Sequence, residues 1–183
     1  MPDYQIKRWS AENFDINSVR LVREAVEQKK WAFATDYIRL YALYNEGGIY
    51  LDSDILLHQN IQHLLQSDYV SAIEFHPIDK KAYNHSITAD HKRKKSIESI
   101  DGVGLQAAFM ASTPHHPFTE KCLAQYQDLS LNQILEKNLL APTMQALVAE
   151  QFGFLYKNEE QHLSNSITLY FFGISANILS DSL

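Results

Sequence analysis

The sequence predicts a single α/β domain over residues 1–183, because segments with helical spacing alternate with short apolar segments typical of strands. Apolar side chains follow a helical period over residues 19–30 and again over residues 31–45. Of the 183 residues, 45% are hydrophobic, which is enough to bury one sizeable core. We expect strands in four apolar segments, residues 49–57, 70–75, 107–112 and 167–172.

The first of these elements are expected to begin and end at recognisable residues. Apolar and polar residues alternate roughly over residues 4–9, as in an edge strand. In the turn that follows, Asn17 or Ser18 could cap the first helix. Lys29 and Lys30 are expected at the C-terminal end of that helix, where positive charge suits the helix dipole. The second helix is expected to end at a Gly-Gly pair, since glycine readily adopts the left-handed conformation of a helix C-terminus. Two later helices are expected at residues 118–127 and 142–151, and the polar residues 76–100 predict a long mobile loop.

Composition excludes several classes of protein. Sixteen Lys and Arg against 22 Asp and Glu give a net charge of -6, which argues against a nucleic-acid partner. Cys122 is the only cysteine, so no intrachain disulfide forms; we expect a buried, inert thiol and a reducing compartment. There is no apolar run of about 20 residues and no signal peptide, which predicts a soluble, cytoplasmic chain or part of one.

Two carboxylates interrupt an apolar segment, and such groups are costly to bury unless they are paired, hydrogen-bonded or bound to a metal. Asp52 and Asp54 are two residues apart, so their side chains converge if the strand continues through them or line one rim if it ends there. Oxygen ligands of this kind suit Mg²⁺ or Mn²⁺, which leave places for substrate phosphates. The alternative is a surface turn with two capping aspartates.

The preceding helix carries a second charged pair, Asp36 and Arg39, whose spacing of three residues puts both on one helix face. A carboxylate and a guanidinium beside a metal site can hold sugar hydroxyls and phosphate oxygens. The alternative is a plain intrahelical salt bridge.

The whole string FATDYIRLYALYNEGGIYLDSDI (residues 33–55) resembles the core signature of the DXD-containing sugar transferases of glycosyltransferase family 32. Residues 3–16, 104–118, 139–153 and 167–172 are similar to other family segments more weakly, with His116-Pro117 matching a His-Pro step. The positions that match the core signature are Ala34, Asp36, Arg39, Leu43, Tyr44, Gly47, Gly48, Tyr50, Asp52 and Asp54.

The resemblance implies a GT-A-like, Rossmann-like fold that binds a nucleotide-sugar donor (a UDP- or GDP-sugar) with Mn²⁺ or Mg²⁺. It implies transfer with retention to a saccharide or lipid-linked acceptor, in bacterial surface polysaccharide synthesis at the inner face of the membrane. By the same resemblance, Asp54 is the metal ligand and Asp52 contacts the ribose, the sugar or the metal. The catalytic residues it implies are Asp52, Asp54 and Arg39. The donor-binding positions are Asp36, Arg39, Asp52, Tyr50 and Gly48.

Two family segments have no counterpart in this sequence, the first strand and a C-terminal His with a Ser-Trp pair. We therefore expect a domain truncated at both ends, and the alternative function is a catalytically incomplete protein that binds sugar nucleotides or polysaccharide. A phosphatase that uses Asp-x-Asp as nucleophile is disfavoured, since Leu56 stands where Thr or Val is typical.

Several other residues have both a structural and a functional interpretation. The basic run at residues 91–95 favours a solvated loop, with peripheral membrane contact as the alternative. His115 and His116 are expected in a loop, with His116 near the acceptor. For Trp9 and Trp31 we expect core packing rather than stacking on a sugar or base.

Overall fold

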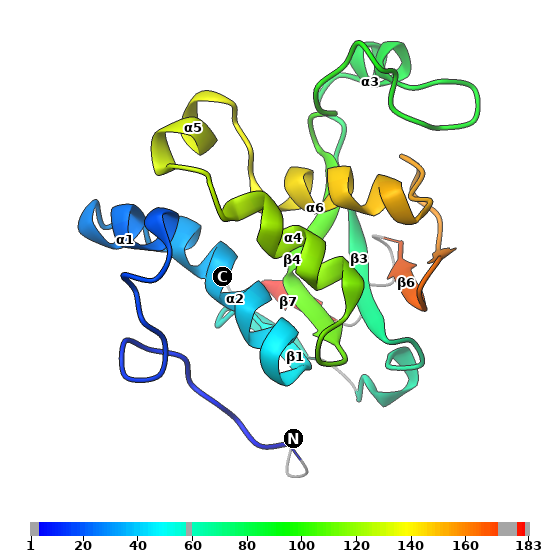
Figure 1. Ribbon diagram of the computed structural model, residues 1–183. Coiled ribbons are helices and arrows are strands. Elements are labelled where there is room, and N and C mark those ends of the chain that lie inside the picture. Colours follow the sequence, from blue (N-terminus) through cyan, green and yellow to red (C-terminus); the bar gives the residue numbers. More distant parts are fainter. Residues whose placement is uncertain (1–3, 58–59, 172–178, 182–183) are drawn as a thin grey trace.

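A five-stranded sheet with helices packed against it organises the structure (Figure 1). The computed structural model describes residues 4–57, 60–171 and 179–181. Neighbouring strands are antiparallel except for the third and fourth across the sheet, which are parallel. In order across the sheet the strands are β1 (Gly48–Leu51), β4 (Val103–Ser112), β3 (Tyr69–Phe75), β6 (Ile167–Tyr170) and β5 (Gln161–Leu163). A separate two-stranded sheet pairs β2 (Ile55–Leu57) with β7 (Leu179–Asp181).

The helices of the described chain complete a mixed α/β domain and confirm the predicted fold class, since this architecture is consistent with a GT-A-like fold. None of the helices described is both long and apolar enough to cross a bilayer. The α-helices are α1 (Arg20–Glu27), α2 (Trp31–Glu46), α3 (Lys80–Ser86), α4 (Pro117–Tyr126), α5 (Leu131–Glu136) and α6 (Ala141–Ala149). Two 3-10 turns accompany them, η1 (Gln62–Leu64) and η2 (Glu150–Phe152).

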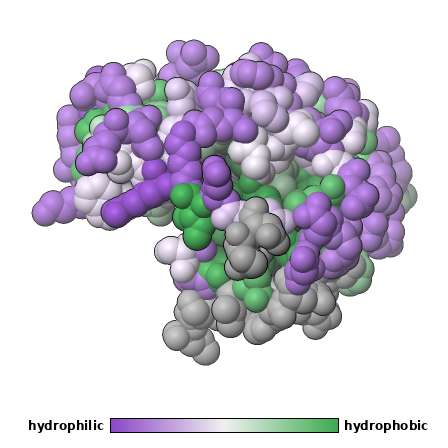
Figure 2. All heavy atoms as spheres, turned by 90° about the horizontal axis from the view of Figure 1, so that it is seen from below, coloured by the Kyte–Doolittle hydropathy of each residue, from purple (hydrophilic) through white to green (hydrophobic). Residues whose placement is uncertain are grey.

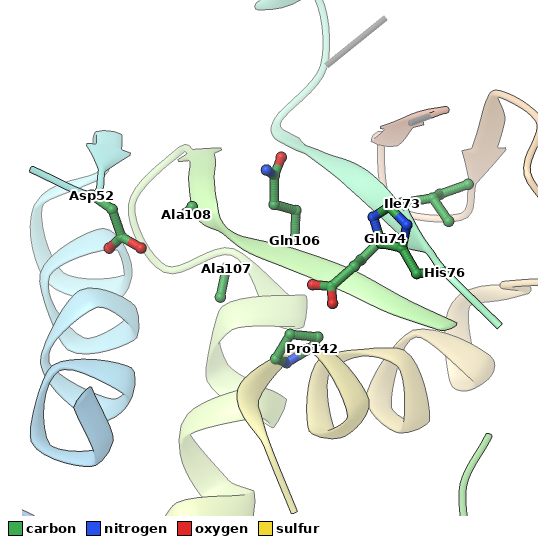
Figure 3. Close-up of a pocket in the computed structure, with 8 residues that line it drawn as sticks. All are labelled: Asp52, Ile73, Glu74, His76, Gln106, Ala107, Ala108 and Pro142. Atoms are coloured by element: carbon green, nitrogen blue, oxygen red, sulfur yellow. The ribbon is translucent and has the colours of Figure 1, made fainter. Parts of the chain in front are cut away.

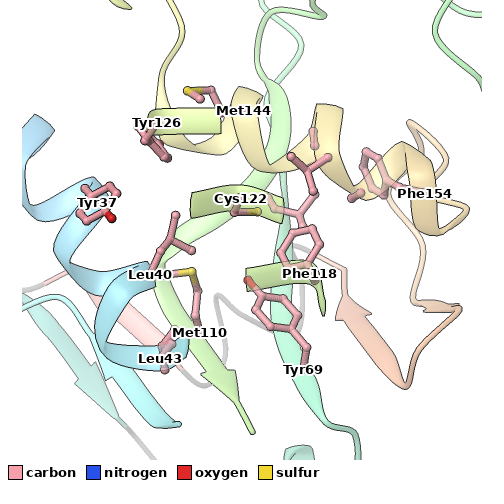
Figure 4. Packing of buried hydrophobic residues seen from close by; sticks show 14 of the residues in the cluster. Tyr37, Leu40, Leu43, Tyr69, Met110, Phe118, Cys122, Tyr126, Met144 and Phe154 are labelled. Atoms are coloured by element: carbon pink, nitrogen blue, oxygen red, sulfur yellow. The ribbon is translucent and has the colours of Figure 1, made fainter. Parts of the chain in front are cut away.

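Buried apolar side chains cover both faces of the central strands β3 and β4. On the helix side, Ile73 and Met110 belong to the main core with residues of α2, α4 and α6 (Figure 4). On the other side, Val70 and Phe109 belong to a smaller cluster that η1 and β2 complete. Successive residues of a strand point to opposite faces, so a strand buried on both sides is a continuous apolar run. The apolar runs at residues 70–75 and 107–112 are such strands, as predicted.

Helix α2 has the bounds that its apolar period predicts. It buries Ala34, Tyr37, Leu40 and Leu43 against the core, at spacings of three residues. It ends before Gly47, whose φ of +70° is a conformation that favours glycine and whose N–H donates to the Leu43 carbonyl at 2.9 Å. The predicted Gly-Gly helix end is therefore confirmed.

The N-terminal predictions are partly wrong. Residues 4–9 form no strand, and Ile6 is almost fully exposed. The segment contacts the rest of the fold through side chains, as in the ion pair between Lys7 and Glu46, and not through a backbone ladder. Neither Asn17 nor Ser18 caps α1. The Ser18 hydroxyl donates instead to the Asp15 carbonyl within the turn. Helix α1 ends at Glu27, so the two lysines predicted at its basic end lie beyond it.

The remaining elements follow the predictions with some exceptions. Helices α4 and α6 and strand β6 lie where they are expected; Phe172, at the end of the last predicted strand, lies outside the described residues. Helix α5 and strand β5 were not predicted, since each is too short to show a clear period. The strand predicted at residues 49–57 is two strands, because the chain turns between β1 and β2.

The predicted loop at residues 76–100 contains helix α3, which the Asp79 carboxylate caps by accepting from Lys81 N–H at 2.7 Å. Part of its basic run contacts the rest of the fold. Arg93 forms a bidentate ion pair with Glu150, with Nε 2.7 Å from Oε1 and Nη2 2.9 Å from Oε2. Lys95 is exposed. The mobility of the segment stays a prediction.

The core role of α2 gives a first prediction. Leu40→Ala should lower the free energy of unfolding by about 2–5 kcal/mol, because Leu40 is fully buried and the substitution leaves a cavity. Leu135→Ala is the matched control, since Leu135 is 41% exposed and should cost about 1 kcal/mol or less. Urea denaturation followed by circular dichroism measures both, and equal losses would contradict the packing described here.

Candidate functional site

Asp52 and Asp54 lie in the turn that separates the two sheets. Strand β1 ends at Leu51; the Asp52 N–H donates to the Ala108 carbonyl at 2.9 Å, and the Asp52 carbonyl accepts from Ile55 N–H at 3.1 Å. The strand therefore ends before the pair, and the two carboxylates line a rim. The Asp52 side chain is 31% exposed, whereas Asp54 belongs to the exposed class.

The Arg39 guanidinium lies beside this turn and is only 7% exposed. Its Nη1 donates to the Ala107 carbonyl at 2.7 Å and lies 3.5 Å from Asp52 Oδ1. Its Nη2 lies 3.1 Å from Asp36 Oδ1 and 3.3 Å from Thr35 Oγ1, and Nε donates to the Thr35 carbonyl at 3.2 Å. Arg39 thus donates three hydrogen bonds, to the Thr35 carbonyl, the Thr35 hydroxyl and the Ala107 carbonyl, and forms ion pairs with Asp36 and Asp52. The pair of Asp36 and Arg39 is thus more than a plain intrahelical salt bridge.

Tyr50 completes the cluster from β1. Its hydroxyl donates to Asp52 Oδ1 at 2.5 Å, and its ring lies under the guanidinium, with Arg39 Cζ 4.8 Å from the ring centroid. Burial raises the pKa of Tyr50, and its hydrogen bond to Asp52 raises it further, while Arg39 acts in the opposite direction. The phenol therefore stays protonated at neutral pH and holds the Asp52 carboxylate in place.

The Asp36 carboxyl is more deeply buried than the Asp52 carboxyl, with 15% of its side chain exposed against 31%. Burial raises its pKa to about 6; Arg39 lowers the pKa and the negative charge of Asp52 raises it. Three acidic or phenolic groups therefore share one buried cation. We call Asp36, Arg39, Tyr50 and Asp52 the Arg39 cluster.

A cleft of about 390 Å³ opens beside this cluster (Figure 3). Asp52 borders it on one side, Glu74 and His76 on the other, and Gln106 lines it from β4. Residues of β3 and β4 line the cleft together because the two strands are antiparallel neighbours, and Glu74 pairs with Gly104. Sequence reasoning missed Glu74, His76 and Gln106. The only available signal was a glutamate inside an apolar strand.

The donor-binding prediction for Gly48 is not supported by a contact in the cluster. Gly48 opens β1 opposite Ser112, whereas Asp52 follows the other end of the strand, about 13 Å away. The structure thus brings together Asp36, Arg39, Tyr50 and Asp52, places Asp54 on the same turn, and leaves Gly48 apart.

His116, Cys122 and the two tryptophans have structural environments. His116 is buried and caps α4, its Nδ1 accepting from Phe118 N–H at 3.2 Å, so it does not lie in the cleft with the residues that border it. Burial raises the pKa of the Cys122 thiol, as an inert cysteine requires. Trp9 packs edge-on against Tyr41 at 5.9 Å, as predicted, but Trp31 is 58% exposed and is not a core residue.

The chemistry of the rim carboxylates fits a hard divalent cation. Among the described residues, no group of three or more His, Cys, Asp or Glu side chains is placed to hold a metal. Mg²⁺ and Mn²⁺ do not need such a group, because one or two carboxylates suffice when substrate phosphates and water complete the coordination. Asp52 and Asp54 are therefore an adequate protein contribution to a site shared with a diphosphate.

Comparison with known protein families agrees with this chemistry. Residues 1–71 match the model of a glycosyltransferase sugar-binding region containing the DXD motif. The match covers less than half of the chain but includes the Arg39 cluster and Asp54, and it supports a glycosyltransferase. None of the curated proteins compared with the chain matches it.

The perturbed carboxyl of Asp36 predicts a pH dependence of stability. The folded chain binds the Asp36 proton more tightly than the unfolded chain, so this group stabilises the fold below pH 4 and the contribution is lost as pH rises to about 6. Asp36→Asn should gain about 1–3 kcal/mol relative to the wild type between pH 4 and pH 7. The exposed Asp128→Asn serves as control. Urea denaturation at each pH measures the difference, and a constant difference for Asp36→Asn would refute the environment described.

Proposed function

We propose that this protein is a metal-dependent glycosyltransferase that moves a sugar from a UDP- or GDP-sugar to an acceptor hydroxyl with retention of configuration. The acceptor is a saccharide or lipid-linked saccharide, in surface polysaccharide synthesis. One observation carries the proposal: the residues of the DXD-family match, far apart along α2 and the β1–β2 turn, form one charged cluster at the edge of a cleft.

Asp54 and Asp52 are the residues that would hold Mn²⁺ or Mg²⁺. The cation would neutralise charge that develops on the leaving diphosphate. Asp54 is exposed and lies at the rim, which suits a ligand that receives a cation together with a substrate. Asp52 is held by Tyr50 and Arg39, so its carboxylate is already oriented before any ligand arrives.

The donor sugar would meet carboxylates rather than the guanidinium. Arg39 is only 7% exposed, donates hydrogen bonds to Thr35 and to the Ala107 carbonyl, and is paired with Asp36 and Asp52, so this residue fits a positioning role better than direct contact with the donor. Asp36 and Asp52 offer acceptor oxygens for sugar hydroxyls, and Arg39 keeps both carboxylates beside each other despite their repulsion. This assignment refines the roles carried over from the sequence.

Binding of a nucleotide sugar tests the proposal directly. The wild-type protein should bind UDP-glucose, UDP-galactose or GDP-mannose in calorimetric titrations with Mn²⁺, and should slowly hydrolyse the donor that it binds. Asp54→Ala should abolish the metal-dependent part of this binding with little effect on stability, because Asp54 is exposed. Asp68→Ala, another exposed aspartate, is the control. Unchanged Mn²⁺ affinity in Asp54→Ala would defeat the metal assignment, and binding without turnover would indicate a sugar-nucleotide binding protein.

A positioning role for Arg39 has its own signature. Arg39→Lys should weaken donor binding about tenfold or more, because a lysine carries its donors on one atom and cannot reproduce the planar fork that spans Asp36, Asp52 and the Ala107 carbonyl. Mn²⁺ should still bind through Asp54. The exposed Arg23→Lys is the matched control. Circular dichroism monitors folding, and a folded Arg39→Lys protein with unaltered donor affinity would reduce the pair to a simple salt bridge.

A further inference from the structure

The cleft beside the Arg39 cluster combines polar and apolar groups in the way that sugar-binding sites require. Glu74, His76 and Gln106 supply a carboxylate, an imidazole and an amide, while Ile73 and Pro142 supply apolar surface. Sugars present hydroxyls that need hydrogen-bond partners and C–H faces that pack on apolar side chains. The volume of about 390 Å³ is at the small end of ligand pockets, as a site for one or two sugar units would be.

Two glycines of β4 and the turn before it hold the walls of the cleft close together. A Cβ at Gly104 would lie 2.6 Å from the Pro142 backbone, so only glycine lets α6 approach the strand this closely. At Gly102, whose φ is +72°, a Cβ would lie 2.1 Å from the His76 carbonyl oxygen. The His76 N–H in turn donates to the Gly102 carbonyl at 2.6 Å. The backbone of His76 therefore packs closely against Gly102, and the backbone of Pro142 packs closely against Gly104.

The polar groups of the cleft are suited to accept hydrogen bonds from a ligand. The side-chain oxygen of Gln106 is buried without a hydrogen-bond partner among the described residues, a situation that costs free energy unless a ligand or water supplies a donor. Glu74 lies partly buried, and burial raises its pKa while His76 lowers it. Figure 3 shows the carboxylates of Asp52 and Glu74 projecting into the cleft from opposite sides.

We propose that this cleft is the acceptor site and that Glu74, with His76 and Gln106, binds hydroxyl groups of an acceptor sugar opposite Asp52. The inference rests on the proposed transferase function. Asp52 belongs both to the Arg39 cluster and to the cleft, so a sugar held by the cluster and an acceptor held by Glu74 would meet at that residue. The family match ends at Ser71 and does not include Glu74, His76 or Gln106.

Saturation-transfer NMR with simple glycosides tests this site, because the acceptor itself is unidentified. The probes are the methyl α- and β-pyranosides of glucose, galactose and mannose, offered at pH 7.5 with Mn²⁺ and with the UDP- or GDP-sugar that binds best. At least one glycoside should bind the wild type, and Glu74→Gln should weaken it about tenfold, since a carboxylate accepts stronger hydrogen bonds from hydroxyls than an amide does. Glu98→Gln is the matched control, because Glu98 is an exposed glutamate in the segment between β3 and β4, and it should leave the affinity for the glycoside unchanged.

Donor affinity, measured by calorimetry on the same proteins, separates this inference from the proposed function. A large loss of glycoside binding in Glu74→Gln with less than a threefold change in donor affinity supports an acceptor site. An equal loss of donor binding would place Glu74 in the donor pocket and overturn the inference. Equal glycoside binding in wild type and Glu74→Gln, or no glycoside binding by the wild type, overturns it too. Absence of donor binding by the wild type would instead refute the transferase function.

Discussion

The buried guanidinium of Arg39 is the interaction on which the candidate site depends. A charge that is 7% exposed is costly to bury unless it is paired and hydrogen-bonded, and Arg39 has ion pairs and hydrogen bonds with residues of α2, β4 and the β1–β2 turn. The contact with the Ala107 carbonyl spans 68 residues of sequence. Because one side chain ties these elements together, removing its charge would leave two neighbouring carboxylates without compensation. The helix, the strand and the acidic turn therefore form one electrostatic unit.

The turn between the two sheets gives its two aspartates different environments. Strand β1 pairs with β4, whereas β2 pairs with β7, so the chain must leave the first sheet at Asp52. Asp52 is consequently half-buried and engaged by Tyr50 and Arg39, while Asp54 is an exposed residue of the same turn. A continuous strand would have placed both carboxylates in one environment. The division favours one oriented carboxylate and one accessible carboxylate, an arrangement suited to a cation that arrives with its substrate.

Polar and apolar residues are unevenly distributed over one face of the molecule. Seen from below in Figure 2, hydrophilic residues cover the outer parts of this face, and hydrophobic residues gather toward its middle. The cleft is likewise lined both by charged residues and by the apolar side chains of Ile73 and Pro142.

Local pattern was sufficient for some elements and residues. The apolar period predicted α2 with nearly its full bounds, and the continuous apolar runs predicted β3 and β4, because these signals arise within one segment. The spacing of three residues also placed Asp36 beside Arg39. The strand predicted at residues 4–9 failed for a related reason: alternation alone does not supply a neighbouring strand, and side-chain contacts hold that segment instead.

What the sequence by itself determined is therefore the α/β class, the glycine-ended helix followed by a pair of aspartates, and the kind of chemistry that such a pair supports. Only the tertiary structure decided that Arg39 contacts Asp52 and the Ala107 carbonyl and that the strand ends before Asp52. It also decided that Glu74, His76 and Gln106 line the same cleft. The physical reason is that these features arise from contacts between residues far apart in the chain. Strand register and close backbone approaches at Gly102 and Gly104 set those contacts, and neither leaves a periodic signal in the sequence.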